Sequence, residues 1–372
     1  MCADMDTRGD ILIVGMDKIT DKSCYLYDAF TSRGIRCVLY SRDKTNLFPD
    51  VKDRLRTTIR LVPKNLFIEI LYFLYLLISC KPRHVEMYST HIVSQFCYAL
   101  ICWICRVPLV IVCIGELYDW EDHRVARKIV DRFSYRIATL LVLTELYMPE
   151  TVRKYRLATS NKTVFCHNRI PVTANCTPDR KEKIILFLNS FKPWRRIELI
   201  LDAVPHIIQK IPEAKVLLVG ATRNLNYLKS THAYEEMLLK KIDTMNLGSH
   251  VETLPFTAHP REYYERASVF MLPADLVFCN FSVLEAMERC VPCVIADAEG
   301  ASMIVENGVS GFIAKQDPSS FAQAVITLLS DESLRKQMGL KARERIIQEF
   351  NIEESINYLL DSYKNHIRSW RR

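Results

Sequence analysis

The stretch between Val269 and Ala296 constrains the fold more than any other part of the sequence. Its two ends, Val269–Leu272 and Cys293–Ala296, are short apolar runs, which predicts two buried strands of a parallel sheet. Between them, Ser282 and Glu285 have the spacing of a capping box, so a helix is predicted to begin near Ser282. The backbone N–H groups at that helix start would point into the polar loop before it, where they can hold an anion such as a nucleotide diphosphate.

Apolar runs and helical periods alternate along the whole chain. In the first half, strands are predicted at 10–16, 36–40, 84–88, 109–113 and 139–143, with a helix at 21–33 and helical periods between the later strands. In the second half, strands are predicted at 184–188, 215–219, 250–253, 269–272 and 293–296. Helices there are predicted at 196–210, 231–246, 260–266, 282–289, 318–330 and 332–349. This alternation is typical of doubly wound α/β domains.

A domain boundary is predicted near 170–182, where two prolines and a run of charged residues separate apolar segments. We therefore expect one Rossmann-like domain over 1–175 and a second over 182–350, followed by a last helix at 352–368. A chain of 372 residues is long enough for two domains of ordinary size.

Composition narrows the classes of function. The net charge of +7 favours anionic partners, but no zinc-finger spacing or aromatic and basic RNA-binding motif indicates nucleic acid. Glycine is scarce, with 10 residues in all. No Walker A or G-x-G-x-x-G sequence follows a predicted strand, which argues against P-loop kinases and nicotinamide-dependent dehydrogenases.

The cysteines suggest a reducing compartment. Their number is odd, 13, and no secretory signal begins the sequence, so we expect free thiols in a cytoplasmic protein. Two C-x-x-C pairs, Cys102 with Cys105 and Cys290 with Cys293, raise a four-thiolate zinc site as a hypothesis. Both pairs lie among apolar or small residues, so packing is the favoured interpretation and no metal is expected.

Seven residues in the stretch that opens this section match the donor-site pattern of the retaining GT-B glycosyltransferases of family 4: Pro273, Glu285, Ala286, Met287, Pro292, Ile295 and Ala296. Gly308 and Gly311 fit the turn that follows in that family. The resemblance implies two Rossmann-like domains that face a central cleft, with the 352–368 helix packed back on the first. It also implies that Glu285 grips the ribose of a nucleotide, whereas a bare capping role is its alternative.

The sugar-contacting part of that pattern is changed in this sequence. The family's first glutamate is replaced by Val277, which cannot accept a hydrogen bond from a sugar hydroxyl, and its two loop glycines by Phe278 and Asn280. Asp275 or Asn280 would have to supply polar contacts. We expect the helix start to bind the donor through these residues: Asn280, Phe281, Ser282, Val283 and Leu284.

A basic loop at 187–199 resembles the family's diphosphate-binding sequence. Arg195 lies at the lysine position and Ser190 at the arginine position, while Lys192 and Arg196 are close enough to share the diphosphate. The alternative is a solvated basic helix start.

Three further residues complete the predicted site. Gly220 would let the chain turn beneath the nucleotide and Phe256 would lie beside its base, although both also fit ordinary turns. Glu116, after a strand of the first domain, would orient the acceptor hydroxyl, and an exposed surface carboxylate is an equally good interpretation of it.

The resemblance implies transfer of a hexose-type sugar from a UDP- or GDP-sugar to a saccharide or lipid-linked acceptor with retention, in the assembly of surface polysaccharide. Front-face substitution needs no protein nucleophile. The absence of a D-x-D motif agrees with a metal-free reaction that has the nucleotide sugar as co-substrate and no other cofactor. A degenerate, non-catalytic partner of an active transferase and a sugar-nucleotide epimerase are the alternatives.

The apolar segment Leu66–Ile78 raises the question of a membrane. It is too short to span a bilayer and contains Glu69, but basic residues flank it on both sides. Peripheral attachment to an anionic membrane is therefore a hypothesis. A well-buried helix on the first sheet is the favoured interpretation.

Overall fold

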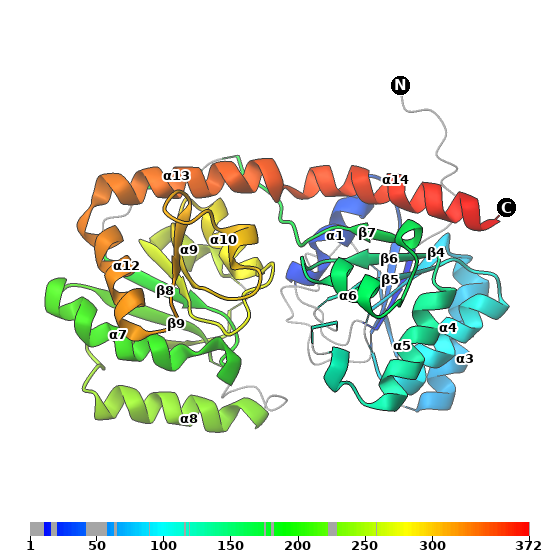
Figure 1. The fold of residues 1–372 in the computed structure, drawn as a ribbon, viewed down its shortest axis with the longest axis horizontal. Coiled ribbons are helices and arrows are strands. Elements are labelled where there is room, and N and C mark those ends of the chain that lie inside the picture. Colours follow the sequence, from blue (N-terminus) through cyan, green and yellow to red (C-terminus); the bar gives the residue numbers. More distant parts are fainter. Residues whose placement is uncertain are drawn as a thin grey trace. The chain divides into compact units, whose positions relative to one another are not determined.

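The computed structural model of the chain describes residues 11–15, 21–41, 58–62, 65–88, 90–114, 117–118, 120–174, 176–179, 182–221, 229–257 and 259–371. The chain divides into two compact units (Figure 1). The first unit consists of Met1–Arg169 together with Ile352–Arg372, and the second of Ile170–Asn351.

The first unit is built on a parallel sheet of seven strands in the order β3-β2-β1-β4-β5-β6-β7. The strands are β1 (Ile11–Val14), β2 (Cys37–Ser41), β3 (Thr58–Leu61), β4 (His84–Met87), β5 (Leu109–Cys113), β6 (Leu140–Leu143) and β7 (Thr163–Phe165). All four residues of β1 are buried, as expected for an inner strand covered on both faces.

Helices cover both faces of this sheet. On one face lie α3 (Leu66–Cys80), α4 (Ile92–Ile104), α5 (Val125–Ile137) and α6 (Met148–Lys154), and on the other α1 (Asp21–Ser32) and α14 (Ile352–Arg371). Short 3-10 helices occur at Trp120–Asp122, Ser160–Lys162 and, in the second unit, Pro193–Arg195.

The last helix, α14, is part of the first unit although it follows the second in sequence. Its residues Ile356, Leu359 and Tyr363 are buried in one core cluster with Tyr27 and Phe30 of α1. The Tyr363 ring lies 6.3 Å from that of Phe30. The apolar face of α14 is therefore used to cover the first sheet.

The second unit is built on a parallel sheet of six strands in the order β10-β9-β8-β11-β12-β13. The strands are β8 (Ile184–Leu188), β9 (Lys215–Ala221), β10 (Val251–Pro255), β11 (Val269–Leu272), β12 (Cys293–Ala296) and β13 (Gly311–Ala314). The helices are α7 (Ile197–Lys210), α8 (Lys229–Thr244), α9 (Arg261–Arg266), α10 (Phe281–Glu288), α11 (Ala301–Ile304), α12 (Pro318–Ser330) and α13 (Glu332–Glu349).

The predicted alternation of strands and helices is confirmed in both units, and the chain has two parallel α/β sheets. Three strands, β3, β7 and β13, were not predicted, and each lies at one end of its sheet. An outermost strand is covered less completely, so its residues need not form a fully apolar run. In β3, for example, three of four residues are exposed and one is half-buried.

Two cysteines contradict the expectation of free thiols. A disulfide joins Cys176, in the segment before β8, to Cys290, which follows α10. Because Cys290 is bonded to Cys176, it is not available for a zinc site with Cys293. Both Cys293 and Cys102 are free and buried, in agreement with packing roles for these two.

Candidate functional site

The loops after β8 and β11 and the end of strand β9 meet at the carboxyl edge of the second sheet. The backbone N–H of Asp275, after β11, donates to the carbonyl of Trp194, after β8, at 2.9 Å. Gly220 in β9 lies so close to the β8 loop that an added Cβ would be 2.0 Å from the Asn189 carbonyl oxygen. The loops that carry the predicted donor residues therefore pack on one another, at the edge where parallel α/β sheets bind ligands.

The helix that follows β11 begins differently from the prediction. The cap of α10 is Asn280, whose side chain accepts from the backbone N–H of Ser282 at 3.0 Å, so the capping box at Ser282 and Glu285 is wrong. Because the helix begins one residue earlier, Glu285 does not reach back to the cap. The Oε2 of Glu285 instead accepts a hydrogen bond from the hydroxyl of Tyr264 at 2.9 Å, and Glu285 is only 9% exposed.

The helix-start N–H groups are also engaged within the protein. Those of Val283 and Leu284 both donate to the Asn280 carbonyl at 3.1 Å, and the side chains of these two residues are fully buried. The expectation of free N–H groups at this helix start is therefore wrong for Ser282, Val283 and Leu284. An anion at this position would compete with Asn280 for them.

The loop between β11 and α10 has the conformation that glycine favours, without the glycine. Phe278 has φ +48°, in the left-handed region. Its N–H and that of Val277 donate to the Glu299 carbonyl, at 2.8 and 3.1 Å. Gly300 lies against this loop, since an added Cβ would be 2.5 Å from the Phe278 Cα. Val277 is 1% exposed, so its side chain is part of the core.

The basic loop after β8 includes the guanidinium of Arg195. The Nε of Arg195 is buried and has no hydrogen-bond partner among the residues that the structure describes. Burial lowers the pKa of Arg195 to about 10, so the group is still charged at neutral pH. A buried donor without a partner is rare in proteins and marks a position suited to an anion.

The other two cations of this loop have partners. Arg196 donates to Asp275 at 3.0 Å and to Glu198 at 2.8 Å, and these hydrogen bonds raise its pKa. The ammonium of Lys192 lies 4.7 Å from the centre of the Trp194 ring. Arg196 thus bridges the β8 and β11 loops.

Three residues of the predicted site remain: Ser190, Phe256 and Glu116. The N–H of Ser190 donates to the Asn189 side chain at 2.9 Å, and that of Phe256 donates to the Ala221 carbonyl at 2.9 Å. Glu116 lies outside the described residues, so its predicted acceptor role stays a prediction.

Two residues of this region were missed from the sequence. Tyr264 on α9 holds Glu285, and Asn189 contacts both Ser190 and Ser282, the latter at 3.5 Å. Asn189 directly follows an apolar predicted strand, so the sequence alone could have placed it at the carboxyl edge of the sheet. The pairing of Tyr264 with Glu285 joins residues 21 apart in sequence and had no local signal.

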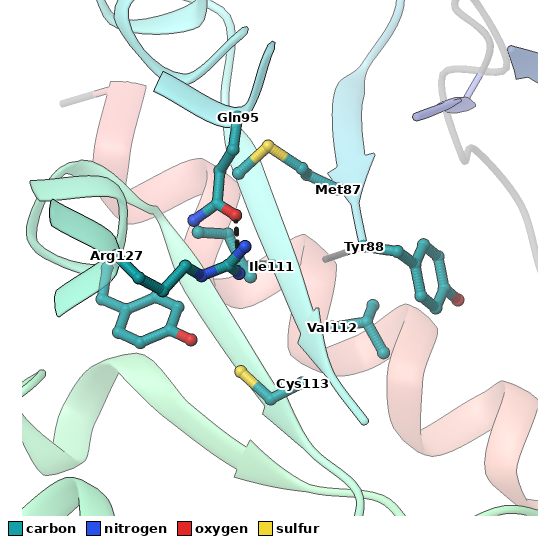
Figure 2. Close-up of a pocket in the computed structure, with 8 residues that line it drawn as sticks. Met87, Tyr88, Gln95, Ile111, Val112, Cys113 and Arg127 are labelled. Atoms are coloured by element: carbon teal, nitrogen blue, oxygen red, sulfur yellow. Dashed lines mark hydrogen bonds between the residues drawn. The ribbon is translucent and has the colours of Figure 1, made fainter. Parts of the chain in front are cut away.

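Arg127 lies close to Gln95, beside a small cavity that is also lined by Met87 and Cys113 at the carboxyl ends of β4 and β5 (Figure 2). Arg127 donates to Asp131 at 2.9 Å, to the Gln95 side chain at 2.9 Å and to the Thr90 carbonyl at 3.1 Å. The cavity beside it, lined in part by Tyr88, has a volume of about 10 Å³, roughly that of one water. The contacts of Arg127 are satisfied within the protein, which gives it a structural role.

Two Rossmann-like parallel α/β domains in one chain, with these loops at the carboxyl edge of the second, define the GT-B fold. The crystal structure of Anabaena Alr3699/HepE in complex with UDP and glucose matches 96% of this chain and 100% of its own, with a TM-score of 0.78 and 16% sequence identity. The fold predicted from the sequence is confirmed.

Residues 174–345 match the family model of glycosyl transferases group 1, which supports the resemblance seen in the sequence. The N-acetyl-alpha-D-glucosaminyl L-malate synthase of Bacillus anthracis is 25% identical over 188 residues, 50% of this chain and 46% of that protein. The UDP-Gal:alpha-D-GlcNAc-diphosphoundecaprenol alpha-1,3-galactosyltransferase of Escherichia coli is 25% identical over 197 residues, 50% of this chain and 48% of that protein. The alignments thus span about half the length of these curated relatives.

Proposed function

We propose that this protein is a retaining glycosyltransferase that moves a hexose-type sugar from a UDP- or GDP-sugar to a saccharide or lipid-linked acceptor. The observation that carries the proposal is the buried Nε of Arg195, which has no partner in the described part of the chain and lies in a loop that packs against the start of the β11–α10 connection. A diphosphate supplies the negative charge and the acceptor oxygens that this guanidinium lacks.

Glu285 is the second element of the proposed donor site. Its carboxylate accepts a hydrogen bond from Tyr264 through Oε2, and carboxylate oxygens can each accept more than one hydrogen bond, so ribose hydroxyls could bind in addition to this contact. A buried carboxylate held in one orientation binds a diol with little loss of side-chain entropy. The HepE complex with UDP and glucose supports a nucleotide-sugar ligand for this fold.

The proposed transfer forms one bond and breaks one. An acceptor hydroxyl oxygen bonds to the anomeric carbon on the face from which the nucleotide departs, and the bond from that carbon to the diphosphate oxygen breaks. The acceptor proton passes to the departing diphosphate oxygen. Arg195 would neutralise the charge that develops on the diphosphate, which lowers the barrier to its departure.

A lipid-linked acceptor and a role in surface polysaccharide assembly are part of the proposal. The name of the Escherichia coli relative specifies a diphosphoundecaprenol acceptor, which supports an acceptor of this kind. The saccharide acceptor is the alternative within the same reaction class.

A non-catalytic partner protein is the second candidate function, and the buried Val277 favours it. A valine that is 1% exposed cannot contact the donor sugar, and Asn280 occupies the helix-start N–H groups. On this alternative, the site would bind a nucleotide weakly or not at all and would transfer no sugar.

Two measurements test the proposal. Thermal unfolding of the purified chain with UDP, GDP and their sugars should show a rise in melting temperature with one nucleotide family, because a ligand of the native state stabilises it by mass action. Slow release of free nucleotide from that same sugar donor should accompany it. Glu285→Gln should lose at least about tenfold in affinity, since one charged hydrogen-bond acceptor is removed.

Glu265→Gln is the matched control, because this carboxylate is exposed, pairs with Arg261 and lies on α9 beside Tyr264. Its affinity should equal that of the unmodified chain. Nucleotide binding without release of nucleotide from any sugar donor would favour the partner protein. No binding of any nucleotide would overturn the proposed donor site.

A further inference from the structure

The outward faces of α3 and α4 carry a continuous set of exposed apolar side chains. On α3, Phe67, Leu71, Tyr75 and Ile78 recur at helical spacing and are 51–71% exposed. On α4, the exposed apolar residues are Val93, Phe96, Trp103 and Ile104. The two helices pack side by side on the first sheet (Figure 1), so the two sets form one surface, named here the α3–α4 face.

This surface is not needed to hold the helices on the sheet. The opposite sides of α3 and α4 already contribute Phe73, Leu76, Tyr98 and Ala99 to the core, each at most 2% exposed. The favoured sequence interpretation, a well-buried helix at 66–78, is therefore correct for one side of α3 and wrong for the other. A helix that is apolar all round normally has a partner on both sides.

The charge around the α3–α4 face is positive. From residue 65 to residue 107 the only carboxylates are Glu69 and Glu86, which are 2% and 0% exposed. The exposed charges in this segment are cationic, with Lys81 after α3 and Arg106 after α4. No exposed acidic group therefore opposes an anionic partner there.

The neighbouring helix α5 extends this surface with more cations. Arg132 and Arg136 are exposed at helical spacing with Val125 and Ile129, which are 73% and 63% exposed. Arg136 also lines a groove of about 690 Å³ together with three other cationic side chains: Arg153, Arg156 and Lys162.

We propose that the α3–α4 face, with the cations of α5, docks on the surface of an anionic lipid bilayer. Aromatic and aliphatic side chains would enter the interfacial layer, while the lysine and arginine groups would reach the lipid phosphates. Among the residues that the structure describes, no helix has the length and apolarity of a membrane span. The positive charge and the exposed apolar side chains of the α3–α4 face both favour a bilayer over a protein partner. A protein partner would need a surface that is large, flat and acidic.

The docking extends the proposed function, because the same bilayer would present a lipid-linked acceptor. Helices α3 and α4 each follow a strand of the parallel sheet, β3 and β4, so Phe67 and Val93 near their starts lie toward its carboxyl edge. The α3–α4 face would therefore bring the edge at which an α/β sheet binds ligands next to the lipid surface. Docking itself requires no nucleotide.

Vesicle flotation tests the proposal with the full chain. The protein should float with vesicles of phosphatidylglycerol and phosphatidylcholine and much less with phosphatidylcholine alone. The double variant Ile78→Asp with Trp103→Asp should partition at least about tenfold more weakly, since two interfacial side chains become charged. The double variant Arg132→Gln with Arg136→Gln should lose most of the preference for anionic vesicles.

The matched control carries the same change at Leu340 and Ile347 of α13 in the second unit, which are 51% and 43% exposed. Leu340→Asp with Ile347→Asp should float like the unmodified chain. Far-ultraviolet circular dichroism and the melting temperature of every variant should match the unmodified chain, because all substituted residues are exposed.

Three results would overturn the docking proposal. The first is that the unmodified chain does not float with anionic vesicles. The second is that Ile78→Asp with Trp103→Asp floats as well as its control, Leu340→Asp with Ile347→Asp. The third is that the chain forms a dimer in solution that Ile78→Asp with Trp103→Asp dissociates, while no vesicle binding is seen. The last result would assign the face to a second copy of the chain. Flotation without any nucleotide-induced rise in melting temperature would support the docking face and count against the proposed donor site alone.

Discussion

Arg195 is a residue of the candidate site at which charge and burial conflict. Its neighbours in the loop have partners, since Arg196 pairs with Asp275 and Glu198, and Lys192 lies over Trp194. The Nε of Arg195 has none among the described residues, and burial alone lowers its pKa. A guanidinium left in this state costs folding free energy, and an anion that pairs with it regains that free energy as binding affinity.

Replacement of Arg195 by alanine should therefore separate binding from stability. Loss of a charge-assisted pair with a diphosphate should weaken nucleotide binding by about 10- to 100-fold, as titration calorimetry would measure. The melting temperature without ligand should stay the same or rise, because an unpaired buried charge is removed. Unchanged nucleotide affinity in Arg195→Ala would contradict a role in phosphate binding.

Arg266→Ala is the control for this substitution. Arg266 is an exposed cation that ends α9 just before β11, at the opposite edge of the second sheet, and pairs with Glu182 at 3.7 Å. The Arg266→Ala substitution removes one positive charge from the second unit, as Arg195→Ala does. The nucleotide affinity of Arg266→Ala should therefore equal that of the unmodified chain. A parallel loss in both variants would indicate a general effect of net charge.

At the scale of elements, the conformation of the β11–α10 loop depends on its contact with Gly300. The loop holds Phe278 at φ +48°, and it does so against Gly300, which has φ +87°. An alanine Cβ at 300 would be 2.5 Å from the Phe278 Cα, which is backbone and cannot rotate away. The loop and the segment after β12 are therefore in direct backbone contact.

Gly300→Ala should lower the free energy of unfolding by about 2–3 kcal/mol, because a left-handed backbone and a backbone overlap both oppose the new Cβ. Gly308→Ala is the matched control. Gly308 has φ +78° but no atom within 4 Å of an added Cβ, so its cost should be about 1 kcal/mol. Urea unfolding would measure both, and equal losses would mean that the contact with Phe278 is unimportant.

How far the sequence predicts the structure also differs between elements. Inner strands such as Val269–Leu272 are recognisable because both faces are covered and every residue is apolar. The cap of α10 was misplaced, since Asn280 and Ser282 are both good caps and local sequence does not decide between them. Contacts between distant residues, such as Tyr264 with Glu285, depend on the packing of α9 on the sheet and leave no periodic signal.

The exposed face of α3 was hidden from sequence reasoning for a different reason. Residues 66–78 are apolar on all sides, so periodicity does not distinguish the side that faces the sheet from the side that does not. Only the position of Phe73 and Leu76 in the core identifies Phe67 and Ile78 as outward. The sequence therefore raises membrane attachment of this segment as a hypothesis, and only the structure shows which of its side chains face outward.

At the scale of the whole molecule, the chain passes from the first unit into the second and then back into the first. The chain leaves the first unit after Arg169, builds the entire second unit, and returns to the first with α14 at Ile352. The first unit therefore cannot complete its core until the last residues of the chain are present. Its core cluster on the α1 side contains four buried residues of α14: Ile352, Ile356, Leu359 and Tyr363.

Leu359→Ala should therefore destabilise the first unit selectively. Leu359 is 2% exposed, and deleting a buried leucine side chain costs about 2–5 kcal/mol. In hydrogen exchange, amides of β1 at 11–14 should lose protection, whereas those of β8 at 184–188 should keep theirs, because α14 belongs to the core of the first unit only. Tyr358→Ala on the same helix is the control, since Tyr358 is 46% exposed and its loss should leave both sheets protected. If Leu359→Ala weakened protection equally in both sheets, the two units would unfold as one cooperative body, and the stability of the candidate donor site would then depend on the last helix of the chain.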